Sequence, residues 1–337
     1  MPTVSAPASR TIELPSEGEI EGLVSSWKAP WPQGYRAWCR GVLVPAHGRG
    51  MVPWEPEKWH PALERVIGAG KDAFVLKAKG IRFTTYLILR SLWLGMWCTD
   101  RAGIYLTVNE KEAFQNADSF QERMRTIWNA LPEWQRWMSP LVECPEGAFG
   151  TAGSLQWSHK KWFRRREGGA LEEGASWLEI GPATPNAGSS GRYTEAMLDE
   201  MERYDHPDAT LAGVMAGTRE TGGGIVAGST LTVDSSMSSR LFQEYVLGQD
   251  GGDSVGLFFG VESLPLVAYQ EYLKKKEKAG LRGAQGLLEL HRLYPRTPEE
   301  AMSAFGKGLA TPEALRECHE ERPELPVPEG LRKWALV

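Results

Sequence analysis

The chain has 337 residues, enough for one large domain or two ordinary ones, and its 42% hydrophobic and 24% charged content is typical of a globular protein. A formal net charge of −5 argues against a protein coated with nucleic acid, although it is compatible with a local basic channel. The four cysteines lie far apart, without a CxxC pair or a histidine at ligand spacing, which excludes a disulfide framework and a zinc site. We therefore expect reduced thiols and a cytosolic protein.

No segment reads as a targeting or membrane element. The N-terminus lacks the basic and apolar regions of a signal peptide. The most apolar segment, residues 86–97, is interrupted by Arg90 and falls well short of about 20 residues, so it predicts a core helix and no membrane span.

The N-terminal 50 residues are rich in Pro, Gly and Ser, with a short helix expected at 17–27. We interpret them as an arm or lid packed on the main domain. Most of the 14 Trp residues in the chain should serve packing, while an exposed subset would stack on bases. Trp59 and His60 precede the first expected core strand, and they fit an adenine platform about as well as a structural role.

The central motif is the sequence KAKGIRFTT at residues 77–85. An apolar run at 73–76 predicts a buried strand, and the periodic apolar segment 85–97 predicts a helix. A strand, a basic glycine-containing loop, paired threonines and a helix are typical of a phosphate-binding loop, in which amides meet the anion and a hydroxyl holds Mg²⁺. The usual consensus has Gly-Lys before the Ser/Thr, where this chain has Arg82 and Phe83.

The next segments extend the strand and helix alternation. We expect a strand at 103–108, a helix at 110–130, and short strands at 154–158 and 176–180. This order predicts a doubly wound, parallel sheet. The basic cluster at 159–166 (HKKWFRRR) is either a solvated face or a grip on phosphates, and a second cluster lies at 274–278.

A turn-rich loop at 181–191 leads into a strand that ends in Asp199-Glu200. An ATPase needs such a pair opposite its phosphate loop, because the Asp holds the Mg²⁺ shell and the Glu polarises the attacking water. Thr194 and Glu195 make the strand unusually polar for a central one, and Asp-Glu is also common at helix starts. Residues 221–232 predict another strand, which begins with glycines and ends in small hydroxyl residues. Such a strand end can sense the hydrolysis of a nucleotide beside the γ-phosphate.

Beyond Asp253 the pattern predicts a strand at 256–261 and helices at 266–278 and 286–293. Thr297, followed by Pro298 and two acids, reads as a helix start.

In this order, the motifs from about 54 to 304 resemble the ATPase portion of the large terminase subunit, the motor that packages DNA into tailed-phage capsids. The resemblance implies an α/β, P-loop NTPase fold of the ASCE, RecA-like type, with a parallel-rich sheet flanked by helices and a small lid subdomain from the N- and C-terminal segments. It divides the chain into an arm or lid at 1–50, an ATPase core at 51–255 and a lid or linker at 256–337.

The resemblance also assigns roles to residues, with ATP and Mg²⁺ as cofactors. It implies catalytic roles for three residues: Glu200, Lys77 and Arg192, the last acting on a neighbouring subunit's nucleotide. Nucleotide binding would fall to Trp59, His60, Lys77, Lys79, Gly80, Arg82, Thr84 and Thr85. Thr84 and Asp199 would position Mg²⁺, and Ser229 with Thr230 would couple hydrolysis to movement. Where the family often has Gly and Gln, this chain has Arg82 and His60.

The implied partners are double-stranded DNA, the portal protein, the small terminase subunit and a separately encoded nuclease, with the chain working as a homo-oligomeric ring in the host cytoplasm. No Asp follows Asp253, whereas the family's nuclease domain needs several, so we expect no nuclease activity in this chain. One alternative is a degenerate nucleotide-binding or structural module that docks on the portal or a nuclease without hydrolysis. Another is a different translocating ATPase such as a helicase, although a helicase usually has two nucleotide cores.

Overall fold

A computed structural model describes residues 16–46, 50–98, 100–116, 118–139, 154–158, 175–189, 191–231 and 240–303. Its centre is a seven-stranded sheet with the strand order β5-β6-β4-β7-β8-β3-β9. Six of these strands are parallel, and β5 alone pairs antiparallel with β6 at one edge. The strands are β3 (Asp72–Lys77), β4 (Ala102–Thr107), β5 (Ser154–Ser158), β6 (Ala175–Pro182), β7 (Glu195–Asp199), β8 (Gly224–Ser229) and β9 (Ser254–Phe259).

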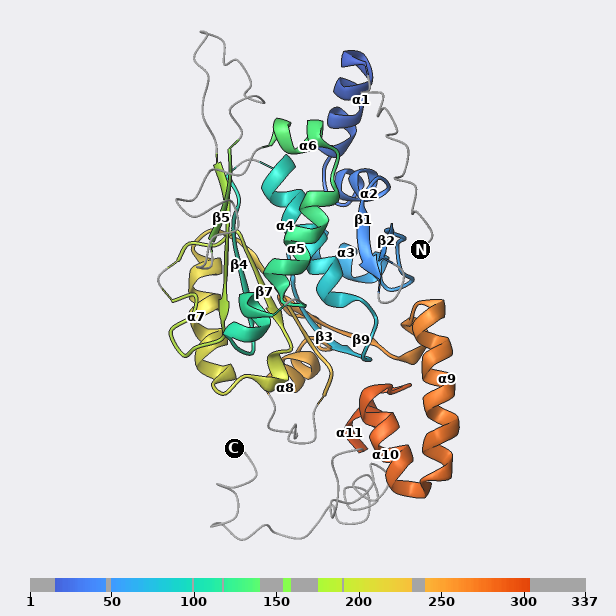
Figure 1. The fold of residues 1–337 in the computed structure, drawn as a ribbon. Helices are drawn as coiled ribbons and strands as arrows, with labels where there is room; N and C mark the ends of the chain where they lie inside the picture. The colour runs from blue at the N-terminus through green and yellow to red at the C-terminus, as the bar shows by residue number, and fades with distance from the viewer. Residues whose placement is uncertain are drawn as a thin grey trace, which may run out of the picture.

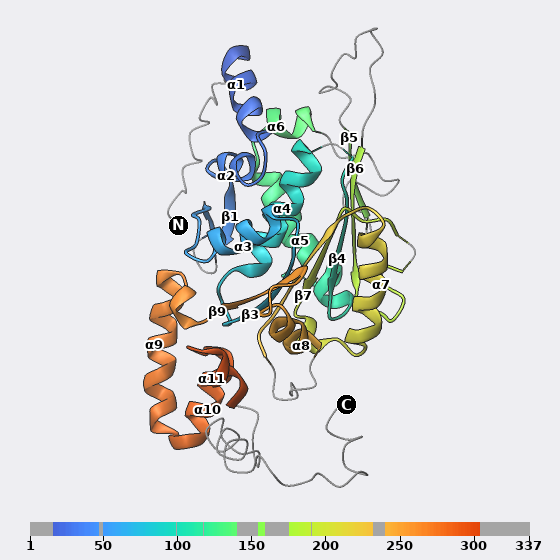
Figure 2. The same cartoon turned by 180° about the vertical axis from the view of Figure 1, so that it is seen from behind.

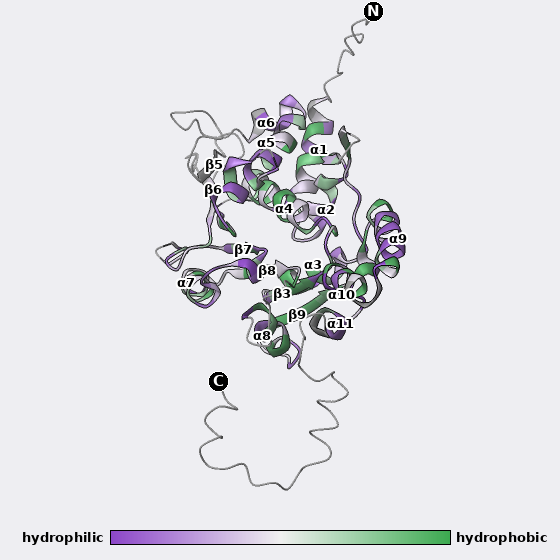
Figure 3. Cartoon of the chain, turned by 60° about the horizontal axis from the view of Figure 1, so that its bottom comes forward, coloured by the Kyte–Doolittle hydropathy of each residue, from purple (hydrophilic) through white to green (hydrophobic). Residues whose placement is uncertain are grey.

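Helices cover both faces of the sheet, as Figure 1 and Figure 2 show. One face carries α3 (His60–Gly68), α4 (Phe83–Trp97) and α5 (Phe120–Ala130), and the other carries α7 (Pro207–Arg219) and α8 (Arg240–Leu247). The pleat of β3 explains why both faces need cover: Ala73 and Val75 enter the first core, while Phe74 and Leu76 enter the second. Figure 3 shows β3 and β9 as hydrophobic ribbons. The expected parallel sheet flanked by helices is therefore confirmed.

The N-terminal segment packs on α4 through aromatic side chains. It contains α1 (Glu17–Trp27), α2 (Gln33–Cys39) and the hairpin of β1 (Leu43–Ala46) with β2 (Gly50–Pro53). Trp93 of α4 donates its indole N–H to the carbonyl of Trp27 at 3.0 Å, and Trp27 stacks on Trp134 of α6 (Glu133–Met138). Most tryptophans that the structure describes serve packing in this way, as the sequence predicts. Nearly every residue of α4 is buried, which explains its apolar character on all sides.

The C-terminal helices form a separate group beside the ends of β3 and β9 (Figures 1 and 2). They are α9 (Leu266–Leu281), α10 (Gly283–Leu293) and α11 (Pro298–Ser303), preceded by the 3₁₀ turn η3 (Val261–Ser263). The Thr297 hydroxyl accepts the amide of Glu300 at 3.2 Å, as expected for the start of α11. The boundary expected at residue 255 falls inside β9, so the core sheet extends to Phe259.

Two local expectations need correction or lie outside the described residues. The helix predicted at 110–130 is split into a π-helical turn, η1 (Lys111–Gln115), and α5. The break occurs because Asn116 is extended and the Ser119 side chain caps α5 by accepting the amide of Glu122 at 3.3 Å. The basic cluster at 159–166 lies outside the described residues. Within the described part of the chain, no helix is both long and apolar enough to cross a bilayer.

The polar strand before Asp199 is nevertheless central in the sheet. Thr194 extends the pairing with β4, since its amide donates to Ala102 O at 2.8 Å and its hydroxyl accepts the amide of Ala102 at 3.0 Å. Glu195 is buried and ion-paired with Arg90 of α4, whose guanidinium also lies over the Trp31 ring at 4.8 Å. The buried Glu195 carboxylate is tolerated in this central strand because Arg90 of α4 neutralises its charge.

Replacing Glu195 with Leu should therefore destabilise the fold by about 3 to 5 kcal/mol, because the Arg90 guanidinium would stay buried without a counterion. Chemical denaturation measures this loss. The double variant Glu195→Leu with Arg90→Met is the matched control, and it should recover most of the stability. Equal losses in the single and double variants would contradict the pairing argument.

Candidate nucleotide-binding site

Predicted site residues converge at the carboxyl ends of three adjacent parallel strands: Lys77 ends β3, Asp199 ends β7 and Ser229 ends β8. Thr107, which the sequence did not single out, ends the neighbouring strand β4. The ladder between β7 and β8 pairs Asp199 with Gly228, and the next ladder pairs Ser229 with Leu76. Ligands of open α/β sheets bind at this edge, because the loops that follow the strands open there.

The loop between β3 and α4 presents a row of backbone N–H groups. The amides of Ala78 and Lys79 donate to the carbonyls of Phe259 and Leu293, each at 2.8 Å. From Gly80 to Thr85, by contrast, no amide has a hydrogen-bond acceptor among the described residues. The N-terminus of α4 also carries partial positive charge, so this row is suited to an anion with several oxygens.

Two residues of the loop adopt left-handed backbone conformations. Gly80 has φ of 91°, where glycine is favoured, and Arg82 has φ of 64° at the N-cap of α4. A side chain at such a position costs about 1 to 2 kcal/mol, which explains why a glycine is expected at residue 82. The Arg82 side chain extends to Glu57, 3.6 Å away.

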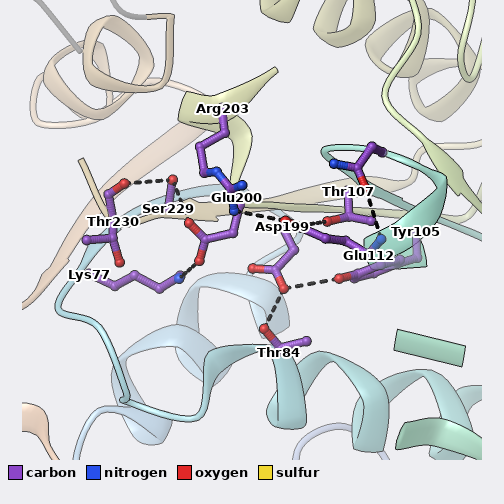
Figure 4. A network of polar contacts seen from close by, with 11 residues as sticks. Lys77, Thr84, Tyr105, Thr107, Glu112, Asp199, Glu200, Arg203, Ser229 and Thr230 are labelled. Atoms are coloured by element: carbon purple, nitrogen blue, oxygen red, sulfur yellow. Dashed lines mark hydrogen bonds and ion pairs between the residues drawn. The ribbon is translucent and has the colours of Figure 1, made fainter. Parts of the chain in front are cut away.

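A charged pair lies under the loop (Figure 4). The Lys77 ammonium donates to Glu200 Oε1 at 2.6 Å, and the Ser229 hydroxyl lies 3.2 Å from Glu200 Oε2. Glu200 itself is left-handed, with φ of 56°, and its amide donates to Gly228 O at 2.8 Å. This backbone turn directs the carboxylate toward Lys77, so strands β3, β7 and β8 meet at one ion pair.

Asp199 forms a second contact centre beside this pair. Its Oδ2 accepts hydroxyl hydrogens from Thr84 at 2.5 Å and from Tyr105 at 3.1 Å. Its other oxygen, Oδ1, is buried and has no donor among the described residues. No group of three His, Cys, Asp or Glu side chains in the described chain could hold a metal alone. Mg²⁺ commonly takes one or two protein oxygens and completes its shell with phosphates and water, so Thr84 and Asp199 fit it.

Burial and mutual charge set the protonation of these groups. Burial raises the pKa of Asp199, and the charge of Lys77 offsets this effect only in part. Burial also acts to raise the pKa of Glu200, but the charge and hydrogen bonds of Lys77, with the bond from Ser229, lower it below its usual value. Burial acts to lower the pKa of Lys77, and the two carboxylates outweigh that effect and raise it. Glu200 is thus the carboxylate that stays ionised most readily.

Two cavities meet at this cluster. One, of about 720 Å³, runs between the β1–β2 hairpin, the loop and the start of α9. The other, of about 560 Å³, lies over Asp199, between η1, α5 and the 3₁₀ turn η2 (Met201–Arg203). The residues that line both cavities are Lys79, Thr84, Arg123, Glu200 and Thr230. Thr230 thus lies at the site beside Ser229. The Ser229 hydroxyl donates to the Thr230 carbonyl oxygen at 3.0 Å.

The adenine platform expected from Trp59 and His60 is wrong for the described structure. Trp59 is 3% exposed and donates its indole N–H to Ile81 O at 3.2 Å, so it supports the loop from behind. His60 is 2% exposed, stacks on Trp54, and accepts the amide of Glu57 at Nδ1, 3.2 Å away. Neither residue lines the larger cavity, whose apolar wall comes from the β1–β2 hairpin and α9.

Arg192 lies apart from the site of its own chain. It precedes β7, at the end of the sheet opposite to Asp199, and its side chain is 80% exposed and paired with Glu220 at 3.0 Å. The suggested role on a neighbouring subunit's nucleotide stays a prediction.

Sequence reasoning missed several residues of the cavity over Asp199. Tyr105 holds Asp199 and stacks on Phe120. Glu112 of η1 accepts from Thr107 at 3.3 Å and pairs with Arg203 at 3.0 Å. A periodicity argument could not find them, because η1 interrupts the expected helix and turns Glu112 toward β4 and η2.

No sequence-family model matches this chain, and neither does any curated protein sequence. Solved structures do resemble it. A mutant of the large terminase ATPase domain of Thermus phage P74-26 is 11% identical, with a TM-score of 0.50 over 72% of this chain and 93% of that domain. The HK97 bacteriophage large terminase is also 11% identical and has a TM-score of 0.49. The match covers 85% of this chain and 50% of the HK97 protein.

The likeness to the P74-26 domain shows the fold of this chain. It is the α/β fold of that large terminase ATPase domain, with six parallel strands flanked by helices. The resemblance inferred from the motifs is confirmed at this level.

Replacing Arg82 with Gly should raise the free energy of unfolding by about 0.5 to 1 kcal/mol. Relief of the left-handed conformation outweighs the extra freedom that glycine gives to the unfolded chain. Arg82→Ala is the control, because it removes the guanidinium but keeps the Cβ, and it should give no gain. Thermal and urea unfolding of both variants check this, and an equal gain in both would assign the effect to the guanidinium.

The free energy of unfolding should also decrease as the pH is lowered, because of His60. Burial, with a smaller effect from Arg36, lowers its pKa from 6.5 to about 3, so protonation below pH 6.5 favours the unfolded chain. This linkage should cost about 2 kcal/mol between pH 7 and pH 5. His60→Phe keeps an aromatic ring and should lose that part of the pH dependence. An unchanged pH profile of unfolding in the variant would contradict a buried neutral histidine.

Proposed function

We propose that this chain binds ATP with Mg²⁺ and hydrolyses it. The observation that carries the proposal is the row of unpaired amides from Gly80 to Thr85 facing the Lys77, Asp199 and Glu200 cluster. An anion with several oxygens and a metal fits this combination of groups. A buried strand, loop and helix of ordinary structural purpose would not need a buried lysine shared by two carboxylates.

Each group has a definite task in this proposal. Lys77, with Lys79, neutralises the β- and γ-phosphates, and Thr84 with Asp199 would hold Mg²⁺, which supplies charge neutralisation at the phosphates when it is bound. Glu200 orients the attacking water, because it stays ionised and its carboxylate is fixed by Lys77 and Ser229. The Ser229 hydroxyl contacts both this carboxylate and the Thr230 carbonyl, so in this proposal Ser229 and Thr230 transmit the change.

The fold supports a more specific role for the hydrolysis. In this proposal the chain is the motor that drives viral double-stranded DNA into procapsids, working as a ring of identical subunits at the portal in the host cytoplasm. Portal protein, small terminase subunit and a separate nuclease are the proposed partners. The fold likeness to the P74-26 domain supports this role.

One observation favours a second candidate, a degenerate nucleotide-binding module without turnover. Arg82 holds a left-handed conformation in the phosphate loop, and its guanidinium lines the larger cavity. Such a module would bind nucleotide weakly and dock on the portal or a nuclease.

Glu200→Gln separates the two candidates. In the motor it should lower steady-state ATP hydrolysis by about 10² to 10⁴-fold, because the amide cannot accept a proton from water, while ATP binding is largely retained. The assay measures phosphate release by the purified chain with and without double-stranded DNA. Glu277→Gln, exposed on α9 and outside the lining of both cavities, is the control and should match the wild type. Turnover in Glu200→Gln equal to that of the control would contradict the assignment of Glu200 as the residue that orients the attacking water.

A further inference from the structure

The phosphate site lacks a cation at the position where a loop lysine usually stands. The residue before Thr84 is Phe83, which is 2% exposed and packs against Gly228, where a Cβ would lie only 2.5 Å from the phenyl ring. Lys77 is 6% exposed, and its charge is already matched by Glu200. With Asp199 also present, the buried cluster of one lysine and two carboxylates has no surplus positive charge for a triphosphate, and of the two loop lysines only Lys79 adds to it.

Arg123 of α5 supplies a cation from another direction. Its guanidinium donates to the Thr85 hydroxyl, one residue beyond Thr84 in the first turn of α4. It is among the few residues that line both cavities, which places it at the junction above the loop. No carboxylate in the described chain pairs with it, whereas Arg203 in the same cavity is paired with Glu112.

We propose that Arg123 binds the phosphates of the nucleotide and replaces, from α5, the charge that Phe83 does not provide. This inference rests on the proposed nucleotide site. A guanidinium has five N–H groups in a planar fork, so the bond to Thr85 fixes one side and leaves others for phosphate oxygens. The Ser119 cap sets where α5 begins and thereby fixes Arg123 opposite the start of α4.

The other cations of the cavity are less well placed for this role. Lys79 is exposed and its backbone amide is bound to Leu293, at the edge of the loop. Arg292 lines only the cavity over Asp199. Arg82, within the amide row, extends to Glu57, 3.6 Å away. Among the described cations that line these cavities, Arg123 is the one whose guanidinium donates to a side chain of the amide row.

The test is equilibrium binding of a fluorescent ATP analogue with Mg²⁺, titrated at several salt concentrations. Arg123→Met keeps an unbranched, flexible side chain and removes the charge, and it should weaken binding by about 10- to 100-fold. It should also reduce the salt dependence of the dissociation constant. Arg123→Lys retains the charge and should recover part of the affinity. Arg125→Met is the matched control, because Arg125 lies on the same helix and pairs with Glu122 at 2.9 Å.

The outcomes are separable. If the wild type binds the analogue and Arg123→Met binds it as tightly as Arg125→Met does, this inference is overturned and the proposed nucleotide site stands. If the wild type fails to bind, the proposed function falls and takes this inference with it. Circular dichroism and thermal unfolding verify that the variants are folded. Should Arg123→Met fail that check, the comparison of Arg123→Lys with Arg123→Gln decides, and equal affinities in these two would overturn the proposal.

Discussion

The structure depends on one buried lysine that two carboxylates share. Lys77 ends the strand β3 in the interior of the sheet, where an unpaired ammonium would be too costly to keep. Glu200 and Asp199 compensate its charge, and both require β7 to end beside it. The parallel arrangement of β7, β8 and β3 is thus coupled to the site, because a shifted register would separate the lysine from its counterions.

The sequence predicted most of the fold because its central elements are strongly patterned. The segments around β3, α4, β7 and β8 are buried and bounded by glycines and polar residues, so their apolar runs and these boundaries were enough to find them. The Lys77, Thr84, Asp199 and Glu200 constellation followed from the order of motifs. The structure brings Lys77 to Glu200 and Thr84 to Asp199, although each pair is separated by more than a hundred residues.

What the sequence could not provide depends on tertiary contacts. Trp59 and His60 resemble ligand-facing aromatics in a linear reading, yet their apolar surroundings draw them under the loop. The interruption at Asn116 was invisible because its apolar neighbours keep a helical spacing, and it decides where Glu112 and Arg123 point. The polarity of Glu195 made the strand look unsuited to the centre of the sheet, because its counterion Arg90 comes from a helix a hundred residues earlier. Long-range pairing of this kind has no local sequence pattern.

The strand order has a consequence for how the protein is made. The first core strand to leave the ribosome, β3, lies between β8 and β9, which are the last strands of the sheet in chain order. Its neighbours are not available until Phe259 has been synthesised, so an apolar strand and the equally apolar α4 wait for about 180 residues of chain. During translation these segments resemble aggregation-prone sequences and need shielding, for instance by a chaperone. The candidate nucleotide-binding site, which needs the ends of β3, β7 and β8, is therefore assembled late in synthesis.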